Sequence, residues 1–203
     1  MPKVTEQHRT DRRLEIALAA LRVFARKGFR AASMADIIAE SGLSAGAIYG
    51  HYRGKDELIQ AAIAEILGER LTDALDGEDG LGAHSPGEVV TRFVRAIDLG
   101  SGDPGILLQV WAQAALDPSM QGVTSRVGEM LLGVFRDYLS VWYQNELGFS
   151  REAAVGSAEI FAPLYVGIVQ GYIVQRTIFS EFDGDGYLRA ASSIRPDLAH
   201  LKS

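Results

Sequence analysis

The sequence predicts an all-α protein, with a small N-terminal three-helix domain of the helix-turn-helix type and a larger helical domain behind it. Three observations lead to this prediction. Apolar residues recur at helical spacing over most of the chain. Ser and Gly residues stand where these runs begin and end, and strand-like alternation of β-branched residues is scarce. We place the domain boundary at residue 55, which gives domains 1–55 and 56–203.

The first helix is predicted over residues 12–27. Asp11 is in position to cap its start, and Gly28 is in position to end it, because glycine readily adopts the left-handed conformation that stops a helix. The side chains expected on its buried face are Leu14, Ala17, Leu18, Leu21, Phe24 and Ala25.

Residues 33–55 predict two short helices joined by a tight turn. Ser33 is a good N-cap, and Asp36 three residues later completes a capping box. Gly42 can end this helix in the left-handed conformation, and Ser44 can cap the next one. Ile48 and Tyr52 are four residues apart, so they share a face and should anchor the second short helix to the core.

The other side of the second short helix carries small or polar residues, namely Ala45, Gly46, Tyr49 and Gly50. This outline is typical of a helix-turn-helix DNA-binding protein, whose second helix lies in the major groove. Tyr49, Ser44 and His51 could donate to phosphates, and Lys55 could reach the sugar-phosphate backbone. The alternative is a pair of ordinary surface helices around an incidental glycine turn.

Residues 12–67 resemble the N-terminal domain of the TetR family of transcriptional regulators. The similarity rests on five short segments: Phe24–Phe29, Ser33–Ile37, Ser41–Ser44, Gly46–Tyr52 and Lys55–Leu58. The resemblance implies that eight positions touch DNA: Ser33, Met34, Ser44, Gly46, Ala47, Tyr49, His51 and Lys55. Ala35 and Gly50 depart from the family pattern. Ala45 is also expected to contact DNA. Together with Gly46 and Ala47 it offers few hydrogen-bond donors, so contact with thymine methyl groups and DNA shape should matter more in recognition.

The distribution of charge supports the same interpretation. Residues 1–55 hold ten Lys and Arg against five acidic residues, a balance of +5, whereas the remainder holds ten against 21, a balance of −11. A basic N-terminal domain on an acidic body is expected for a protein that binds nucleic acid through that domain. Binding should therefore weaken steeply as the salt concentration rises.

The remainder of the chain is predicted to be helical. A connecting helix at 56–75 is followed by a Gly-rich acidic loop at Asp76–Pro86. Further helices are expected at the ranges 87–99, 104–116, 119–146, 151–180 and 184–193, and Ser150 is in position to cap the helix at 151–180.

The helix at 151–180 is apolar nearly all round, which predicts burial on two sides. One face holds Phe161, Tyr165, Ile168, Tyr172 and Phe179. The other face, which we assign to a homodimer interface, holds Leu164, Gly167, Gly171, Val174 and Ile178, with Ile160 beside them. Gly167 and Gly171 would allow two helices to approach closely, although they could instead pack within the chain. The family resemblance also implies dimers, formed by the last two long helices.

Aromatic residues with a few polar atoms are the usual lining of a small-molecule pocket. The candidates for binding a small, largely apolar ligand are Trp111, Met130, Val134, Tyr138, Phe161 and Tyr165. Pro163 lies among them and removes one backbone donor from its helix. Packed core is the alternative role for this set.

Several function classes are disfavoured. The four histidines lack metal-ligand spacing, and nucleophile, phosphate-loop and dinucleotide motifs are missing, so we expect no enzyme, metal or cofactor. The chain has no cysteine, a polar N-terminal stretch and no long uncharged apolar run, so we expect a cytoplasmic protein without membrane partners. The expected function is that of a dimeric, ligand-responsive repressor that binds a palindromic operator in double-stranded DNA. The alternative is a helical protein-interaction module without ligand sensing.

Overall fold

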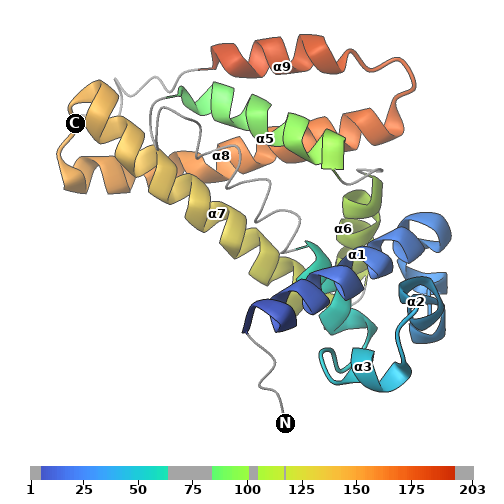
Figure 1. Cartoon of the computed structure of the whole chain (residues 1–203). Helices are drawn as coiled ribbons and strands as arrows, with labels where there is room; N and C mark the ends of the chain where they lie inside the picture. The colour runs from blue at the N-terminus through green and yellow to red at the C-terminus, as the bar shows by residue number, and fades with distance from the viewer. Residues whose placement is uncertain (1–5, 64–83, 101–104, 117, 195–203) are drawn as a thin grey trace. The chain divides into compact units, whose positions relative to one another are not determined.

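The computed structural model describes residues 6–63, 84–100, 105–116 and 118–194 (Figure 1). Regular secondary structure in these ranges is all helical, which confirms the predicted fold class. The chain divides into two compact units. Unit 1 comprises Met1–Leu67 and Gly105–Val127, and unit 2 comprises Gly68–Pro104 and Gly128–Ser203. The domain boundary at residue 55 stays a prediction, since this division follows compactness and places 105–127 with the N-terminal helices.

Helix α1 (Glu6–Ala31) is longer than the predicted 12–27. Asp11 lies inside the helix, so its assignment as the cap was wrong. Gly28 has a φ of 76° and a ψ of 157°, and it interrupts the helix as predicted, but helical residues follow it up to Ala31.

The buried face of α1 agrees with the predicted one at Ala17, Leu21 and Phe24, which are buried, and differs from it elsewhere. Ile16, Ala20 and Val23 are fully buried, whereas Leu18 is 38% exposed and Ala25 is exposed. Apolar residues occur on several sides of this helix, so their spacing alone did not identify the side that meets the core.

The next elements of unit 1 follow the prediction closely. Helix α2 (Met34–Ser41) and helix α3 (Ala45–Tyr49) are joined by Gly42, and residues 55–63 are helical again. The rest of the predicted helix 56–75, and residues 76–83 of the predicted loop, lie outside the described residues. Ile37, Ile48 and Leu58 are fully buried, so each of these segments contributes to the core of the unit.

Helix α6 (Gly105–Leu116) completes the core of unit 1 by packing against α1. The interruption at Gly28 faces this helix, because a Cβ placed on Gly28 would lie 3.3 Å from the Gln109 side-chain oxygen. The first residues of helix α7 (Pro118–Leu147) also belong to unit 1. There, Arg126 donates to the Gln60 side-chain oxygen at 2.6 Å.

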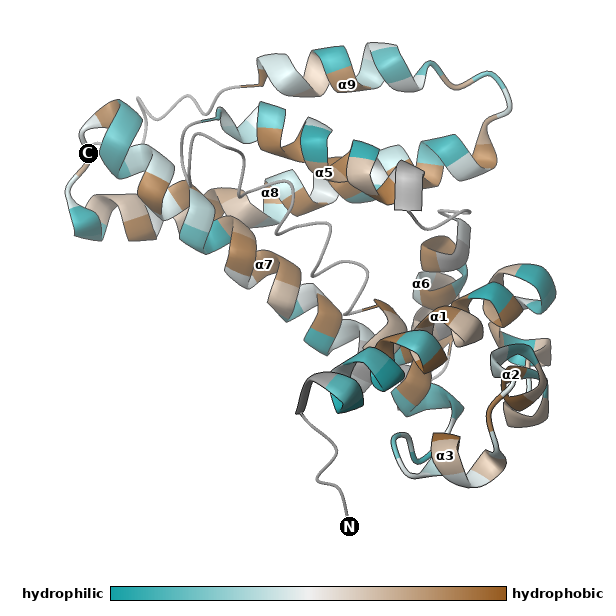
Figure 2. Cartoon of the chain, viewed as in Figure 1, coloured by the Kyte–Doolittle hydropathy of each residue, from teal (hydrophilic) through white to brown (hydrophobic). Residues whose placement is uncertain are grey.

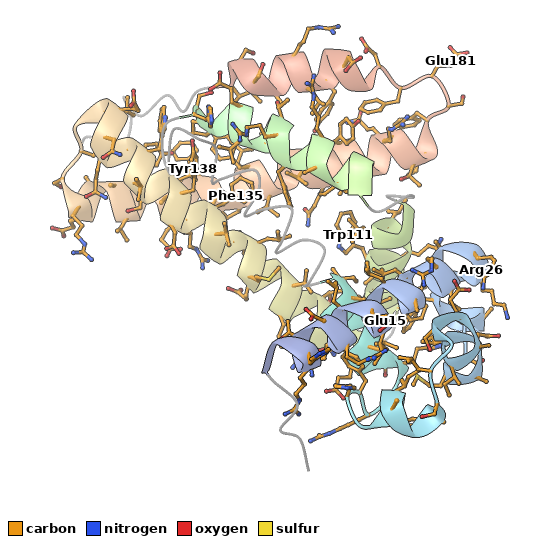
Figure 3. The ribbon with its side chains drawn as sticks, in the orientation of Figure 1. Glu15, Arg26, Trp111, Phe135, Tyr138 and Glu181 are labelled. Carbon is orange, nitrogen blue, oxygen red and sulfur yellow. The ribbon has the colours of Figure 1, made fainter. Side chains whose placement is uncertain are left out.

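Unit 2 contains helix α5 (Pro86–Gly100), the remainder of α7, helix α8 (Arg151–Ile178) and helix α9 (Gly184–Ser193). These bounds agree with the predicted ranges to within two residues. Helix α5 packs against both α8 and α9 (Figure 1). Aromatic rings connect the helices: Phe135 of α7 lies 6.4 Å from Phe93 of α5 and is stacked at 6.4 Å on Tyr165 of α8. Figure 3 shows Phe135 and Tyr138 on the side of α7 that meets these helices.

Helices α5 and α9 approach so closely that only glycine fits at position 87. A Cβ there would overlap the carbonyl oxygen of Ala191, which is backbone and cannot rotate away. Gly171 of α8 also faces α9, since a Cβ on it would lie 2.8 Å from the Tyr187 hydroxyl oxygen.

One side of α8 is apolar and open in the single chain. Ile160 is 58% exposed and Leu164 is 51% exposed, and a Cβ on Gly167 would meet nothing within 4 Å. On the opposite side, Tyr165 and Tyr172 are buried as predicted, whereas Phe179 caps the helix and is exposed. The assignment of Phe179 to the buried face was therefore wrong. Figure 2 colours α8 by the hydropathy of its residues.

Helix α8 is long and apolar enough to cross a membrane by length and composition alone. The sequence analysis did not anticipate this, because it required a longer run without charges, and residues 160–175 form an uncharged run of only 16. A core helix of a soluble protein meets the same criterion, and 39% of the apolar window is already buried within the chain.

Candidate nucleic-acid interface

The start of α2 is fixed by reciprocal hydrogen bonds, as the sequence predicts. The Asp36 amide donates to Ser33 Oγ at 3.2 Å, and the Ser33 amide donates to Asp36 Oδ2 at 3.0 Å. Lys27 of α1 donates to the other carboxylate oxygen at 2.6 Å. The Lys27 contact, and then those from Ser33, lower the pKa of Asp36 to about 2. The carboxylate therefore stays ionised near neutral pH and holds α1 and α2 together.

The turn between α2 and α3 has the predicted geometry. Gly42 has a φ of 66°, in the left-handed region that favours glycine. The Leu43 amide donates to Ser41 Oγ at 3.2 Å, and the Ala47 amide donates to Ser44 Oγ at 3.2 Å. Ser44 thus caps α3, and its own hydroxyl hydrogen stays available for an acceptor outside the protein.

Helix α3 is anchored to the core on one side and exposed on the other. Ile48 is fully buried and Tyr52 is 2% exposed, as predicted for the anchoring pair. The Tyr52 hydroxyl donates to the main-chain oxygen of Arg13 at 3.1 Å, which ties the segment to α1. Ala45 and Gly46 are exposed, and Tyr49 is 52% exposed. A short helix with small outward side chains can approach a duplex groove closely.

Two of the predicted contact positions flank this surface at the start of α2. Ser33 is exposed, while Met34 is half-buried. Ala47 of α3 is also half-buried. All three lie next to exposed positions of the helix-turn-helix, so their contact with DNA remains a prediction.

Lys55 has a structural role that the sequence analysis missed. Its ammonium donates to the carbonyl oxygens of Phe29 at 2.9 Å, Ala32 at 3.1 Å and Arg30 at 3.5 Å. It also lies 4.5 Å from the centroid of the Phe29 ring. All three ammonium hydrogens are directed to the end of α1, so we reassign Lys55 from phosphate contact to positioning of the helix-turn-helix.

His51 follows α3 and is half-buried. Its Nδ1 atom is buried and has no hydrogen-bond partner within the described part of the chain. The pKa of His51 is lowered, first by burial and then by the positive charges of Arg13, Arg9 and Arg12. These arginines come from the first turns of α1, a region that the sequence analysis had counted only in the overall charge.

The predicted ligand-binding residues fall in different parts of the molecule. Trp111 belongs to unit 1, and the other five belong to unit 2. Tyr138 and Tyr165 are buried, whereas Met130, Val134 and Phe161 are half-buried. The Tyr138 hydroxyl donates to the main-chain oxygen of His84, so this residue of the set is part of the packed core of unit 2. The sequence analysis did not single out Tyr143, whose hydroxyl is buried and has no partner among the described residues.

The predicted dimer residues also separate. Leu164, Gly167 and Ile178 lie on the open side of α8, and Val174 is half-buried. Gly171 instead receives Tyr187 of the same chain, so its assignment to the dimer interface is corrected. Helical spacing could not tell which of the two glycines was already covered within the chain, and the assignment of this face to a dimer stays a prediction.

Comparison with known proteins gives a match where the interface lies. Residues 16–62 match the model of bacterial regulatory proteins of the tetR family. The chain is 41% identical over 70 residues to an uncharacterised helix-turn-helix transcriptional regulator, YfiR of Bacillus subtilis, covering 34% of each chain. It is 42% identical over 81 residues to the transcriptional repressor Rv1474c of Mycobacterium tuberculosis, covering 40% of this chain and 42% of that protein. The match thus spans about a third of the first of these relatives and less than half of the second.

Solved structures resemble the chain over nearly its whole length. GusR of Salmonella enterica has a TM-score of 0.65 at 19% identity, covering 94% of this chain and 95% of that one. A transcriptional regulator of Saccharomonospora viridis, solved in complex with choline, has a TM-score of 0.59 at 19% identity, covering 90% and 94%. At these identities the likeness shows the fold, while residues 16–62 carry the relationship in sequence. Residues 16–62 therefore carry an N-terminal domain of the tetR-family type, and the chain as a whole shares its fold with solved transcriptional regulators.

Proposed function

We propose that this protein is a ligand-responsive transcriptional repressor that binds a palindromic operator as a homodimer. The observation that carries the proposal is the open outer surface of α3, made of Ala45, Gly46 and Tyr49, above the buried anchors Ile48 and Tyr52. The small side chains of Ala45 and Gly46 leave the backbone at the start of α3 open to a groove. The repressor relative from Mycobacterium tuberculosis, 42% identical over 81 residues, supports repression as the direction of control.

The contacts proposed for DNA follow from exposure. Ser44 and Tyr49 would donate hydroxyl hydrogens to phosphates, and His51 would donate a ring N–H from the end of the segment. Ala45, Gly46 and Ala47 would meet base edges through methyl groups and bare backbone, which favours recognition of thymine methyl groups and groove shape. Ser33 and Met34 would add contacts at the start of α2.

The homodimer is proposed to form through the open face of α8. This face presents Ile160, Leu164 and Ile178, each more than half exposed, and the first two lie in an uncharged stretch at 160–175. Exposed apolar patches of this kind mark interaction sites. Arg136 of α7 pairs with Glu159 of α8 at 2.8 Å, so charge returns just before the apolar stretch begins. A symmetric pair would present two reading helices about 34–36 Å apart, the spacing of successive major grooves.

The ligand is proposed to bind in the aromatic interior of unit 2, near Tyr143. A buried hydroxyl without a partner costs about 1–3 kcal/mol, and an acceptor atom on a ligand would recover this energy. Apolar contacts from Met130, Val134 and Phe161, which are half-buried, rest on the sequence analysis alone. The choline-bound neighbour has the same fold and supports a small molecule as the class of ligand. The role of Trp111 rests on the sequence alone.

The proposed mechanism is a shift of population between two states of the dimer. A ligand that binds one state better would change operator affinity by roughly 5–150-fold, which corresponds to about 1–3 kcal/mol of coupling. A ligand with equal affinity for both states would change nothing. The predicted connecting helix 56–75 would carry the coupling.

The test is a selection of DNA from a random duplex pool, followed by fluorescence anisotropy with the enriched sequence at two salt concentrations. Enrichment of a palindrome, bound as a dimer and more weakly at high salt, is the expected result. If the protein enriches no sequence and binds no duplex at low salt, the helix-turn-helix does not bind DNA and the interaction-module alternative takes its place. Compounds are then screened for a change in anisotropy on the enriched site.

A further inference from the structure

The first turns of α1 lie against the end of the helix-turn-helix. The Tyr52 hydroxyl donates to the main-chain oxygen of Arg13 at 3.1 Å, and the Arg13 guanidinium carbon lies 4.9 Å from the centroid of the Tyr52 ring. Two independent contacts thus fix this part of α1 beside residues 51 and 52. A residue near the start of the chain is held next to the segment that follows the reading helix.

Three arginines gather at this place. Arg9, Arg12 and Arg13 are spaced by three and four positions, so they share one side of α1, and all three side chains are exposed. Each of them raises the positive potential at His51. Arg12 pairs with Glu15 at 2.7 Å, but both partners are about half exposed to water. Within the described part of the chain, Arg9 and Arg13 form no ion pair.

The positive charge of these three arginines is only partly neutralised by acidic side chains within the described part of the chain. Like charges held close together repel, and the half-buried His51 beside them has a buried nitrogen without a partner. An anion bound beside the exposed arginines would relieve this repulsion. The site is continuous along the chain with Tyr49, which is exposed on α3, so the anion in reach of a bound duplex is a backbone phosphate.

We propose that Arg9, Arg12 and Arg13 of α1 form a phosphate-binding cluster beside His51, which adds a contact with the DNA backbone from outside the segment 33–55. The inference rests on the proposed DNA binding and adds a contact surface to it. Phosphate contacts position a protein on the duplex without reading its sequence. The cluster therefore contributes affinity and salt dependence equally to operator and unrelated DNA.

The test compares the salt dependence of binding for the full-length protein and its variants. Arg9→Gln and Arg13→Gln are each expected to reduce the slope of log affinity against log salt by about 1, because one fewer counterion is released. Between 50 and 200 mM salt, each variant then loses about 3.5-fold less affinity than the wild type does. The ratio of operator to unrelated affinity stays unchanged.

Three controls separate charge from folding. Arg13→Lys keeps the charge and should keep the slope near that of the wild type, which distinguishes a phosphate contact from loss of packing on Tyr52. Arg95→Gln, which changes an exposed arginine of α5 in unit 2, should leave slope and affinity as they are. Circular dichroism identifies any variant with reduced helix content.

The outcomes discriminate between the two proposals. If the glutamine variants bind operator with the wild-type slope, the phosphate cluster is wrong and the DNA-binding proposal stands. If the slope falls but only the operator is affected, the arginines read bases, and the cluster as described is again wrong. If the wild type binds no duplex at all, the proposed function fails and takes the cluster with it.

Discussion

Lys27 Nζ lies 2.6 Å from Asp36 Oδ1, which joins α1 to the capping box of α2. The same carboxylate accepts from the amide and the hydroxyl of Ser33, at 3.0 and 2.8 Å. One acidic side chain therefore fixes both the beginning of α2 and its attachment to the first helix. Its ionisation becomes part of the stability of the DNA-binding region.

Acid should weaken the fold through Asp36. Its pKa is lowered from 3.8 to about 2, so the folded state favours the ionised form. The stabilisation is complete above about pH 4 and is lost as the pH falls towards 2. We expect Asp36→Asn to melt at a lower temperature near neutral pH and to show a smaller further decrease between pH 4 and pH 2. Thermal unfolding followed by circular dichroism across pH 2–6 measures this.

The matched control for the acid experiment is Asp137→Asn, at an exposed aspartate of α7. It should retain the wild-type pH profile. Equal acid sensitivity in the wild type and in Asp36→Asn would assign the effect to other carboxylates.

Replacing Lys55 should destabilise unit 1 without changing the salt dependence of DNA binding. Lys55→Met removes charged hydrogen bonds to the carbonyls of Phe29 and Ala32, a loss of about 1–3 kcal/mol. Urea unfolding gives the stability, and anisotropy gives the salt slope. A slope lower by about 1 would restore Lys55 as a phosphate contact. Arg53→Gln, at an exposed position two residues away, is the comparison for stability.

Tyr49→Phe should weaken binding to every duplex by a similar factor. The ring is 52% exposed on α3, and the proposed contact of its hydroxyl is a phosphate, which carries no sequence information. Affinities for the operator and for a panel of single-base variants provide the measurement. A loss confined to one base position would show that Tyr49 contacts a base.

A charge on the open face of α8 should dissociate the dimer. Leu164→Glu would bury a carboxylate against the partner helix, and we expect the dimer dissociation constant to rise at least about tenfold, which corresponds to 1.4 kcal/mol. Analytical ultracentrifugation measures the change. Leu116→Glu is the control, since Leu116 is 81% exposed on α6, outside the proposed interface. Unchanged dimers in Leu164→Glu would place the interface elsewhere.

Gly87 should tolerate no side chain. A Cβ at this position overlaps backbone of α9 at Ala191, so Gly87→Ala forces α5 and α9 apart and should cost about 1–3 kcal/mol. Gly128→Ala in α7 is the counterpart: its Cβ would meet nothing within 4 Å, and alanine favours the helix by up to about 1 kcal/mol. Comparing their melting temperatures tests the packing. A stable Gly87→Ala variant would contradict it.

The features predicted correctly from sequence are those determined over a few residues. Ser33 with Asp36, the left-handed Gly42 and the cap at Ser44 each depend on neighbours within four positions, and all are confirmed. The anchoring pair Ile48 and Tyr52 follows from helical spacing in the same way.

The features that were missed or wrongly predicted depend on contacts between distant parts of the chain. Lys55 caps a helix that ended 24 residues earlier, and Gly171 is covered by Tyr187 of another helix. Apolar residues lie on several sides of α1, so the sequence alone did not show which side packs against the core. Tyr143 looked like any core aromatic in the sequence, because only the folded chain shows which buried hydroxyl lacks an acceptor.

The ammonium of Lys55 closes a ring in the chain, since it returns to the carbonyls of Phe29 and Ala32 after the whole helix-turn-helix has been traversed. Between these contacts, Ile37 and Ile48 are buried in the core, while positions 45, 46 and 49 are exposed and do not contribute to it. The two ends of the segment between residues 33 and 54 are thus held together by the hydrogen bonds of Lys55. We expect that substitutions at its outward positions would change the proposed operator specificity while the Lys55 hydrogen bonds stay intact.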